Sequence, residues 1–169
     1  MKNKFNFLGL ILITFLVSCS TSEEEQIKEE LTALGSTQIG LIDDQRILDA
    51  ESEPGNWLAH GRTYEERRFS PLTGINKENV SELGLVWSKD MGTNRALEAT
   101  PIVVDGIMFF TSTWSRVYAV DALTGETIWK FDPKVPGEWA RKACCDIVNR
   151  GVAVYNGKVY SASLDGRLF

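Results

Sequence analysis

The sequence is poor in the residues that bind transition metals and haem. It contains one histidine, His60, and three cysteines. No C-x-x-C-H sequence is present, so this segment has no attachment site for a c-type haem. His60 has no partner at metal-binding spacing, and we expect it to be a packing residue. A G-x-G-x-x-G sequence is also missing, which disfavours a nicotinamide cofactor.

Long runs of one charge or of apolar residues are missing too. Lys and Arg number 18 against 23 Asp and Glu, a net charge of −5, and no basic cluster is long enough to follow a phosphate backbone. This balance argues against a general nucleic-acid binder. The main apolar run, Phe5–Val17, is shorter than the about 20 residues that a membrane-spanning helix needs. With 43% hydrophobic and 24% charged residues, the composition is that of a globular protein.

The N-terminus predicts export. Lys2 and Lys4 precede the apolar run, as in a signal peptide, which we place at residues 1–18. The next residue, Cys19, ends a sequence that resembles a bacterial lipoprotein processing box, and that resemblance implies lipidation of this cysteine. Residues 19–50 then form a lipid-anchored tether on a bacterial membrane, facing the periplasm. An ordinary signal peptide with a chance cysteine and an uncleaved anchor are the alternatives.

The two remaining cysteines, Cys144 and Cys145, are adjacent. Disulfides persist in an exported protein. Consecutive Cα atoms lie about 3.8 Å apart, below the usual disulfide span of about 4.4–6.8 Å, so a ring between neighbours is strained and adds little by loop closure. A vicinal pair in an exported chain therefore favours a functional disulfide. Two free, buried thiols on opposite faces of a strand are the alternative.

From residue 85 onward the pattern predicts an all-β fold. Short β-branched and aromatic runs are separated by turn residues such as Asp105-Gly106. The predicted strands include Leu85–Ser88, Thr100–Val104, Ile107–Thr111 and Arg116–Val120. Before them, a weak apolar periodicity over residues 31–49 predicts a short helix.

An internal repeat indicates the architecture. Gly106–Phe110 reappears as Gly157–Ser161, 51 residues later, and Gly84–Trp87 corresponds to Glu126–Trp129, 42 residues later. A period of about 40–50 residues with several strands per unit is typical of a β-propeller. We therefore expect the N-terminal part of a longer protein, holding one to two blades. Its parts are an N-terminal segment (51–84), a first complete blade (85–132), a cysteine loop (133–151) and an incomplete next blade (152–169).

The repeat contains a motif. Residues 119–129 fit A-x-D-x-x-T-G-x-x-x-W, which resembles the tryptophan-docking motif of pyrroloquinoline quinone (PQQ) dehydrogenase propellers. Asp121 and Thr124 can satisfy backbone groups of a turn, Gly125 permits a positive φ, and Trp129 offers a face for packing between neighbouring blades. Because non-enzymatic propellers share this motif, it identifies the fold and not the activity.

A second run points to an activity. Residues 144–151, with sequence CCDIVNRG, resemble the vicinal cysteine pair and following arginine of the type I PQQ-dependent alcohol dehydrogenases, including methanol dehydrogenases. Residues 97–106 are similar to their first inner strand, where a glutamate, here Glu98, precedes T-P-x-V. Residues 57–62 and 68–72 are similar to that family's N-terminal segment. The resemblance implies eight blades in the full protein.

The resemblance also implies roles for residues. PQQ, a flat ortho-quinone with three carboxylates, is held without a covalent bond. A Cys144–Cys145 disulfide stacks on one face, Arg150 lies by the quinone oxygens, and Glu98 hydrogen-bonds the cofactor edge. From residue type alone, Arg150 is an ordinary surface ion-pair residue and Glu98 a solvated strand-edge residue.

The remaining machinery is expected beyond Phe169. In the family, a Ca²⁺ or lanthanide ion polarises the quinone, an aspartate removes the alcohol proton, and hydride passes from a primary or related alcohol to PQQ. Electrons then leave to a cytochrome c or similar carrier. We assign neither metal ligands nor the base aspartate to residues 1–169, so this fragment alone is expected to be inactive.

Two other functions compete with this one. A propeller lipoprotein that acts as a protein-binding scaffold in outer-membrane assembly shares the lipoprotein box and the docking repeats, but it does not need Glu98, the cysteine pair or Arg150. A degenerate paralogue would keep the pocket floor without the chemistry.

Overall fold

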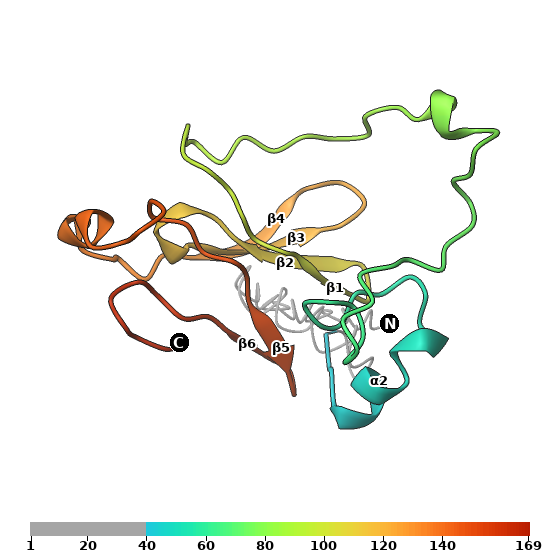
Figure 1. Ribbon diagram of the computed structural model, residues 1–169, viewed down its shortest axis with the longest axis horizontal. Coiled ribbons are helices and arrows are strands. Elements are labelled where there is room, and N and C mark those ends of the chain that lie inside the picture. Colours follow the sequence, from blue (N-terminus) through green and yellow to red (C-terminus); the bar gives the residue numbers. More distant parts are fainter. Residues whose placement is uncertain (1–39) are drawn as a thin grey trace, which may run out of the picture. The chain divides into compact units, whose positions relative to one another are not determined.

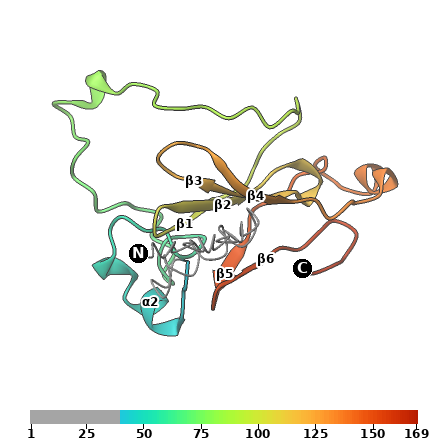
Figure 2. The same cartoon turned by 180° about the vertical axis from the view of Figure 1, so that it is seen from behind.

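The computed structural model describes residues 40–169 as antiparallel β-structure with a few short helices (Figure 1). One sheet has four strands in sequential order: β1 (Ile102–Val104), β2 (Ile107–Thr111), β3 (Val117–Asp121) and β4 (Thr127–Phe131). A second pair, β5 (Ala153–Tyr155) and β6 (Lys158–Tyr160), lies beside that sheet in both ribbon views (Figures 1 and 2). Helix α2 spans Asp44–Leu48, and single 3₁₀ turns lie at Ala50–Ser52, Val80–Glu82, Thr113–Ser115 and Gly137–Arg141.

The predictions for the N-terminus fall outside this range. The signal peptide and the lipidation site Cys19 lie outside the described residues. Within residues 40–169, no helix has the length and apolar character needed to cross a membrane.

Two hairpins confirm the 51-residue repeat. The turn between β1 and β2 has positive φ at Asp105 (51°) and Gly106 (80°), and the turn between β5 and β6 has positive φ at Asn156 (47°) and Gly157 (70°). Two consecutive left-handed residues are the geometry of a type I′ turn, whose twist matches that of the flanking strands. β5–β6 is therefore the counterpart of β1–β2 in the next blade.

The core lies between the sheet, β5 and the N-terminal segment. Ile102 and Val104 of β1 point inward while Val103 between them is only partly buried, as the period of two requires. Their buried neighbours are Ile42, Ala50, Leu58, Phe109, Ala119 and Val154. Trp57 pairs with Val103 through two backbone hydrogen bonds, of 2.7 and 3.0 Å, which close the free edge of β1. Every residue of β4 is exposed, so the opposite edge of the sheet is open.

The docking motif builds the turn between β3 and β4. One carboxylate oxygen of Asp121 accepts hydrogen bonds from the backbone amides of Leu123 and Thr124, both at 2.8 Å. Gly125 has φ of 73°, and a Cβ there would stand 2.5 Å from the ring of Trp87. The indole of Trp87 also donates to the carbonyl of Ala122 at 3.2 Å. The tryptophan that docks on this turn is therefore Trp87, the counterpart of Trp129 in the repeat.

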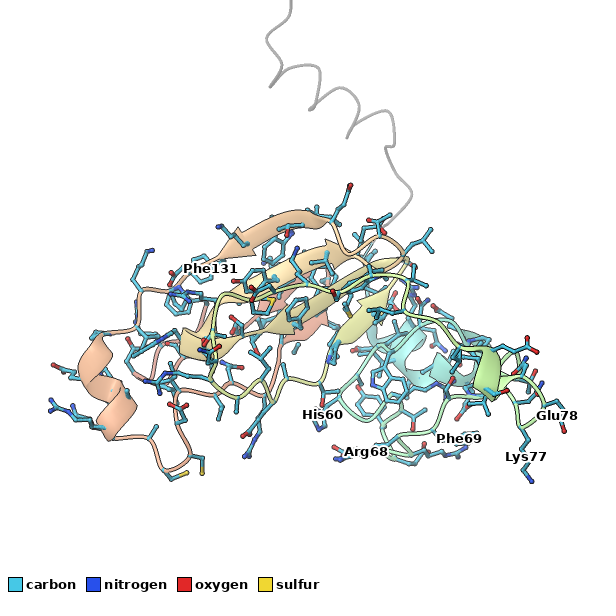
Figure 3. The ribbon with its side chains drawn as sticks, turned by 90° about the horizontal axis from the view of Figure 1, so that it is seen from above. His60, Arg68, Phe69, Lys77, Glu78 and Phe131 are labelled. Carbon is cyan, nitrogen blue, oxygen red and sulfur yellow. The ribbon has the colours of Figure 1, made fainter. Side chains whose placement is uncertain are left out.

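The structure differs from three predictions. Residues 85–88 form no strand, because they find no partner strand among the described residues, and Leu85 is 83% exposed. The folded part begins earlier than residue 51, since Ile42 is fully buried. His60 is exposed rather than packed (Figure 3), and its backbone carbonyl accepts a hydrogen bond from the indole of Trp57 at 3.1 Å.

An ion-pair cluster fastens residues 41–53 to the β1–β2 turn. The Arg46 guanidinium donates to Glu53 at 2.6 Å and to Asp105 at 2.9 Å, and it also reaches the carbonyl of Leu41 at 2.8 Å. Hydrogen bonds from Arg46 hold the pKa values of Glu53 and Asp105 below their usual range. Both carboxylates are therefore more acidic in the folded protein than in the unfolded chain.

We expect Asp105→Asn to loosen this attachment. The hydrogen-exchange protection factors of the Trp57 and Val103 amides should fall about tenfold, which corresponds to about 1.4 kcal/mol. Asparagine tolerates the left-handed backbone at this turn, so the fall in protection measures the removal of the carboxylate charge and not backbone strain. Because the folded-state pKa values are lowered, the stabilisation is complete above about pH 5 and is lost as the pH falls below about 4. Native-state hydrogen exchange at pH 7 and pH 4 measures both effects.

The control is Glu78→Gln. Glu78 is exposed and makes no ion pair with any residue in the described range (Figure 3). Protection that stays unchanged in Asp105→Asn, or that falls equally in both variants, would show that the cluster does not hold the segment.

Candidate functional site

A backbone contact between the two blades brings the predicted site residues together. Thr100, just before β1, and Gly151, just before β5, form a parallel bridge. The amide of Thr100 donates to the carbonyl of Arg150 at 3.1 Å. Thr100 and Gly151 are counterparts in the 51-residue repeat, so equivalent points of neighbouring blades lie side by side here.

Glu98 and Arg150 form an ion pair next to this bridge. Arg150 donates from Nε to Oε2 of Glu98 at 3.3 Å, across 52 positions of sequence. The Arg150 side chain is 75% exposed, and its two terminal nitrogens make no hydrogen bond to the described residues. An exposed pair of this kind contributes little to stability. Glu98 therefore holds the Arg150 guanidinium at Nε, and the two terminal nitrogens of Arg150 are left as free hydrogen-bond donors among the described residues.

The vicinal cysteines lie close enough to this pair for both of its charges to act on Cys145. Both Cys144 and Cys145 are exposed, which differs from the alternative of two buried thiols. Their sulfur atoms are not bonded to each other in the structure, and the disulfide stays a prediction. A hydrogen bond with Cys144 raises the pKa of the Cys145 thiol. The charge of Arg150 acts to lower that pKa and the charge of Glu98 to raise it, so both charged groups act electrostatically on Cys145. The structure thus gathers Glu98, the cysteines and Arg150 into one region.

The side chain of Asn149 anchors the residue before Arg150. Its Oδ1 accepts from the hydroxyl of Thr111 and from the amide of Gly151, both at 3.0 Å. Its Nδ2 donates to the carbonyl of Ala162 at 2.7 Å. One amide group therefore ties together the end of β2, the backbone after Arg150 and the next blade.

A hollow of about 410 Å³ opens beside Arg150. Its walls come from the two sides of the second hairpin: Asn149, Arg150, Gly151, Val152, Ala153, Ala162, Ser163 and Leu164. The volume lies within the range of ligand pockets, about 300–1,000 Å³. Glu98 and the cysteines do not line it, so the hollow extends the site on the Arg150 side only.

Sequence reasoning missed the residues that hold the site in place. Asn149 and Gly151 lie within the recognised motif but received no role. The signal that points to them is the repeat length, because residues 51 apart occupy equivalent places in neighbouring blades. No group of three or more histidine, cysteine, aspartate or glutamate side chains in residues 40–169 could hold a metal ion.

A family model matches residues 57–169. Its description is "PQQ: Glucose/ethanol/alcohol dehydrogenase, beta-propeller domain". The match covers the docking motif, the Glu98 segment and the cysteine loop, and the sheet and repeated hairpin described above are those of a partial propeller.

Individual proteins agree with the family match. The chain is 56% identical over 127 residues to quinohemoprotein alcohol dehydrogenase ADH-IIG of Pseudomonas putida, covering 75% of this chain and 18% of that protein. It is 54% identical over 114 residues to 1-butanol dehydrogenase (cytochrome c) of Thauera butanivorans, covering 68% of this chain and 16% of that protein. The chain thus spans less than a fifth of the length of these relatives.

Solved structures match the fold. The structure of ADHIIG from Pseudomonas putida HK5 superposes with a TM-score of 0.76 at 53% identity, covering 79% of this chain and 19% of that one. A europium-containing methanol dehydrogenase superposes with a TM-score of 0.68 at 37% identity, covering 74% of this chain and 22% of that one.

Proposed function

Because this chain belongs to the glucose/ethanol/alcohol dehydrogenase family of PQQ β-propellers, we propose that the full protein oxidises a primary or related alcohol with non-covalent PQQ. The observation that carries the proposal is the ion pair of Glu98 with Arg150, 52 positions later in the sequence, whose two charges both act on Cys145. When bound, PQQ supplies the two-electron acceptor for hydride from the alcohol.

The residues present fit such a cofactor. A flat, anionic quinone needs a cation with free donors and a non-ionic surface to lie against. Arg150 has its two terminal nitrogens free of described partners, and the two exposed sulfur atoms offer a surface without formal charge. We propose that Cys144 and Cys145 form the floor, as a disulfide in the exported protein, and that Glu98 accepts or donates at the cofactor edge.

The chemistry of this chain is electrostatic. A fixed guanidinium stabilises negative charge that develops on an oxygen beside it, and such groups act without reorganising during the reaction. Glu98 accepts the hydrogen bond from Nε of Arg150, so the terminal nitrogens of Arg150 point away from Glu98. A Ca²⁺ or lanthanide ion and a base aspartate, held by residues beyond Phe169, complete the proposed site. The europium in the name of one structural relative favours a metal ion of this kind.

The proposal extends to partners and location. One relative is named as linked to cytochrome c and another as a quinohemoprotein, which supports a cytochrome c or similar carrier as the electron acceptor. Residues 1–19 support export and a lipid anchor at Cys19, so the active site would face the periplasm.

The test is reconstitution of the full-length protein. We expect one PQQ to bind per chain in the presence of Ca²⁺ or a lanthanide, followed by alcohol-dependent reduction of a redox dye and of cytochrome c. Titration of the intrinsic tryptophan fluorescence with PQQ measures binding, and omission of the metal is the control. A full-length protein that folds but neither binds PQQ nor oxidises alcohols would instead fit the scaffold function.

A further inference from the structure

A second ion pair joins the same two segments as Glu98 and Arg150. Arg95 donates from Nη1 to Oδ1 of Asp146, the residue directly after Cys145. Arg95 and Asp146 are 51 positions apart, one repeat length, as are Thr100 and Gly151. The contact is therefore part of the side-by-side alignment of residues 95–100 with residues 146–151.

The cysteines have few other attachments. Between Trp139 and Cys145, the hydrogen bonds and ion pairs among described residues stay within the cysteine loop: the amides of Lys142 and Ala143 both donate to the carbonyl of Trp139. After the cysteines, Ile147 is fully buried and its carbonyl accepts from the amide of Trp114 at 3.1 Å. The Arg95–Asp146 contact is thus the connection to another segment that lies nearest to Cys145.

The two ion pairs have opposite polarity. In one, the cation Arg95 lies on the first segment, and in the other the cation Arg150 lies on the second. A slip of a few residues in one direction would bring Arg95 toward Arg150, and a slip in the other direction would bring Glu98 toward Asp146. Like charges on facing chains repel, so the polarity specifies a single register.

The backbone at Asp146 explains why this residue needs a contact. Its φ is 72°, in the left-handed region that non-glycine residues rarely adopt. Aspartate is among the few residues that tolerate it, and a contact to its side chain favours the conformation that leads the chain from the exposed Cys145 to the buried Ile147.

We propose that Arg95 and Asp146 are positioning residues for the cofactor floor: their ion pair ties the cysteines to the segment that carries Glu98 and so sets the place of the floor relative to Arg150. This inference rests on the proposed function, because that function supplies the cofactor. The ion pair itself is present in the structure whatever the cofactor is. Arg95 is half exposed, so the pair adds little to global stability. Its effect is local.

A double-mutant cycle in the full-length protein tests the proposal. The variants are Arg95→Gln, Asp146→Asn and both together, and asparagine keeps the tolerance for positive φ. We expect each single variant to speed hydrogen exchange of the amides of residues 143–147 by about three- to tenfold in PQQ-free protein, with the Trp57 and Val103 amides unchanged. PQQ affinity should fall by a similar factor. The double variant should lose no more than either single variant.

Two further variants sharpen the result. Lys142→Gln removes a cation and an exposed ion pair, Lys142–Glu138, from the same loop, and it should leave exchange and affinity as in the wild type. Arg95→Lys keeps the charge without the planar fork and should recover part of the loss.

The two readouts separate two kinds of failure. Unchanged exchange in Arg95→Gln and Asp146→Asn, or equal acceleration in Lys142→Gln, overturns the positioning role whatever PQQ does. A wild type that binds no PQQ overturns the proposed function, and the exchange data then still decide whether the ion pair holds the loop.

Discussion

Arg150→Gln is expected to lower kcat for alcohol oxidation by about 10²–10³-fold in the reconstituted full-length enzyme, the loss seen when one donor to a developing negative charge is removed. Glutamine keeps a hydrogen-bond donor on a shorter side chain but not the charge. The KM for the alcohol should change little, because Arg150 is proposed to act on the cofactor rather than on the substrate. Steady-state kinetics at saturating PQQ separates the two parameters.

Two comparisons make this prediction specific. Arg150→Lys keeps a positive charge but loses the fork of donors, so it should recover only part of the rate. Arg68→Gln removes a comparable exposed arginine, paired with Glu66 at 2.8 Å and shown in Figure 3, and should leave kcat unchanged. A kcat near the wild-type value in Arg150→Gln would mean that Arg150 is an ordinary surface ion-pair residue.

The fold was predictable where local chemistry and the repeat agree. The Asp105-Gly106 turn between two β-branched runs predicted the β1–β2 hairpin, and the 51-residue shift predicted the second hairpin. Residues 85–88 show the limit of local patterns. They have the composition of a strand, but a strand needs a partner for its backbone groups, and what the structure uses from this run is the ring of Trp87 on the β3–β4 turn.

The site was predictable in its residues but not in its supports. The motif around Cys144 and Arg150 could be recognised from sequence, and the structure brings Glu98 to Arg150. The roles of Arg95 and Asn149 depend on which segments lie next to each other, and a single sequence gives that only through the repeat. Residue type carries no such information, because an exposed arginine is most often only solvated.

Gly151→Ala is expected to weaken PQQ binding by tenfold or more. A Cβ at this position would stand 2.8 Å from the carbonyl oxygen of Thr100, and φ is 129°, a region that side chains rarely adopt. The obstacle is backbone, which cannot turn aside as the end of a flexible side chain can. Relief requires the two segments to separate, and the strain of such a conformation is about 1–3 kcal/mol. Separation lengthens the bond from the Thr100 amide to the Arg150 carbonyl and draws Arg150 away from Glu98.

Two other glycines distinguish damage to the site from damage to the fold. Gly137→Ala lies in the same loop, with open space around its Cβ and no positive φ, and should bind PQQ as the wild type does. Gly125→Ala strains the docking turn against Trp87, so it should lower the unfolding temperature while the folded fraction keeps its PQQ affinity. Fluorescence titration and thermal unfolding of all three variants give the comparison. If Gly151→Ala lost stability but kept its affinity, like Gly125→Ala, the bridge between Thr100 and Gly151 would support the propeller alone and would not position Arg150 for the cofactor.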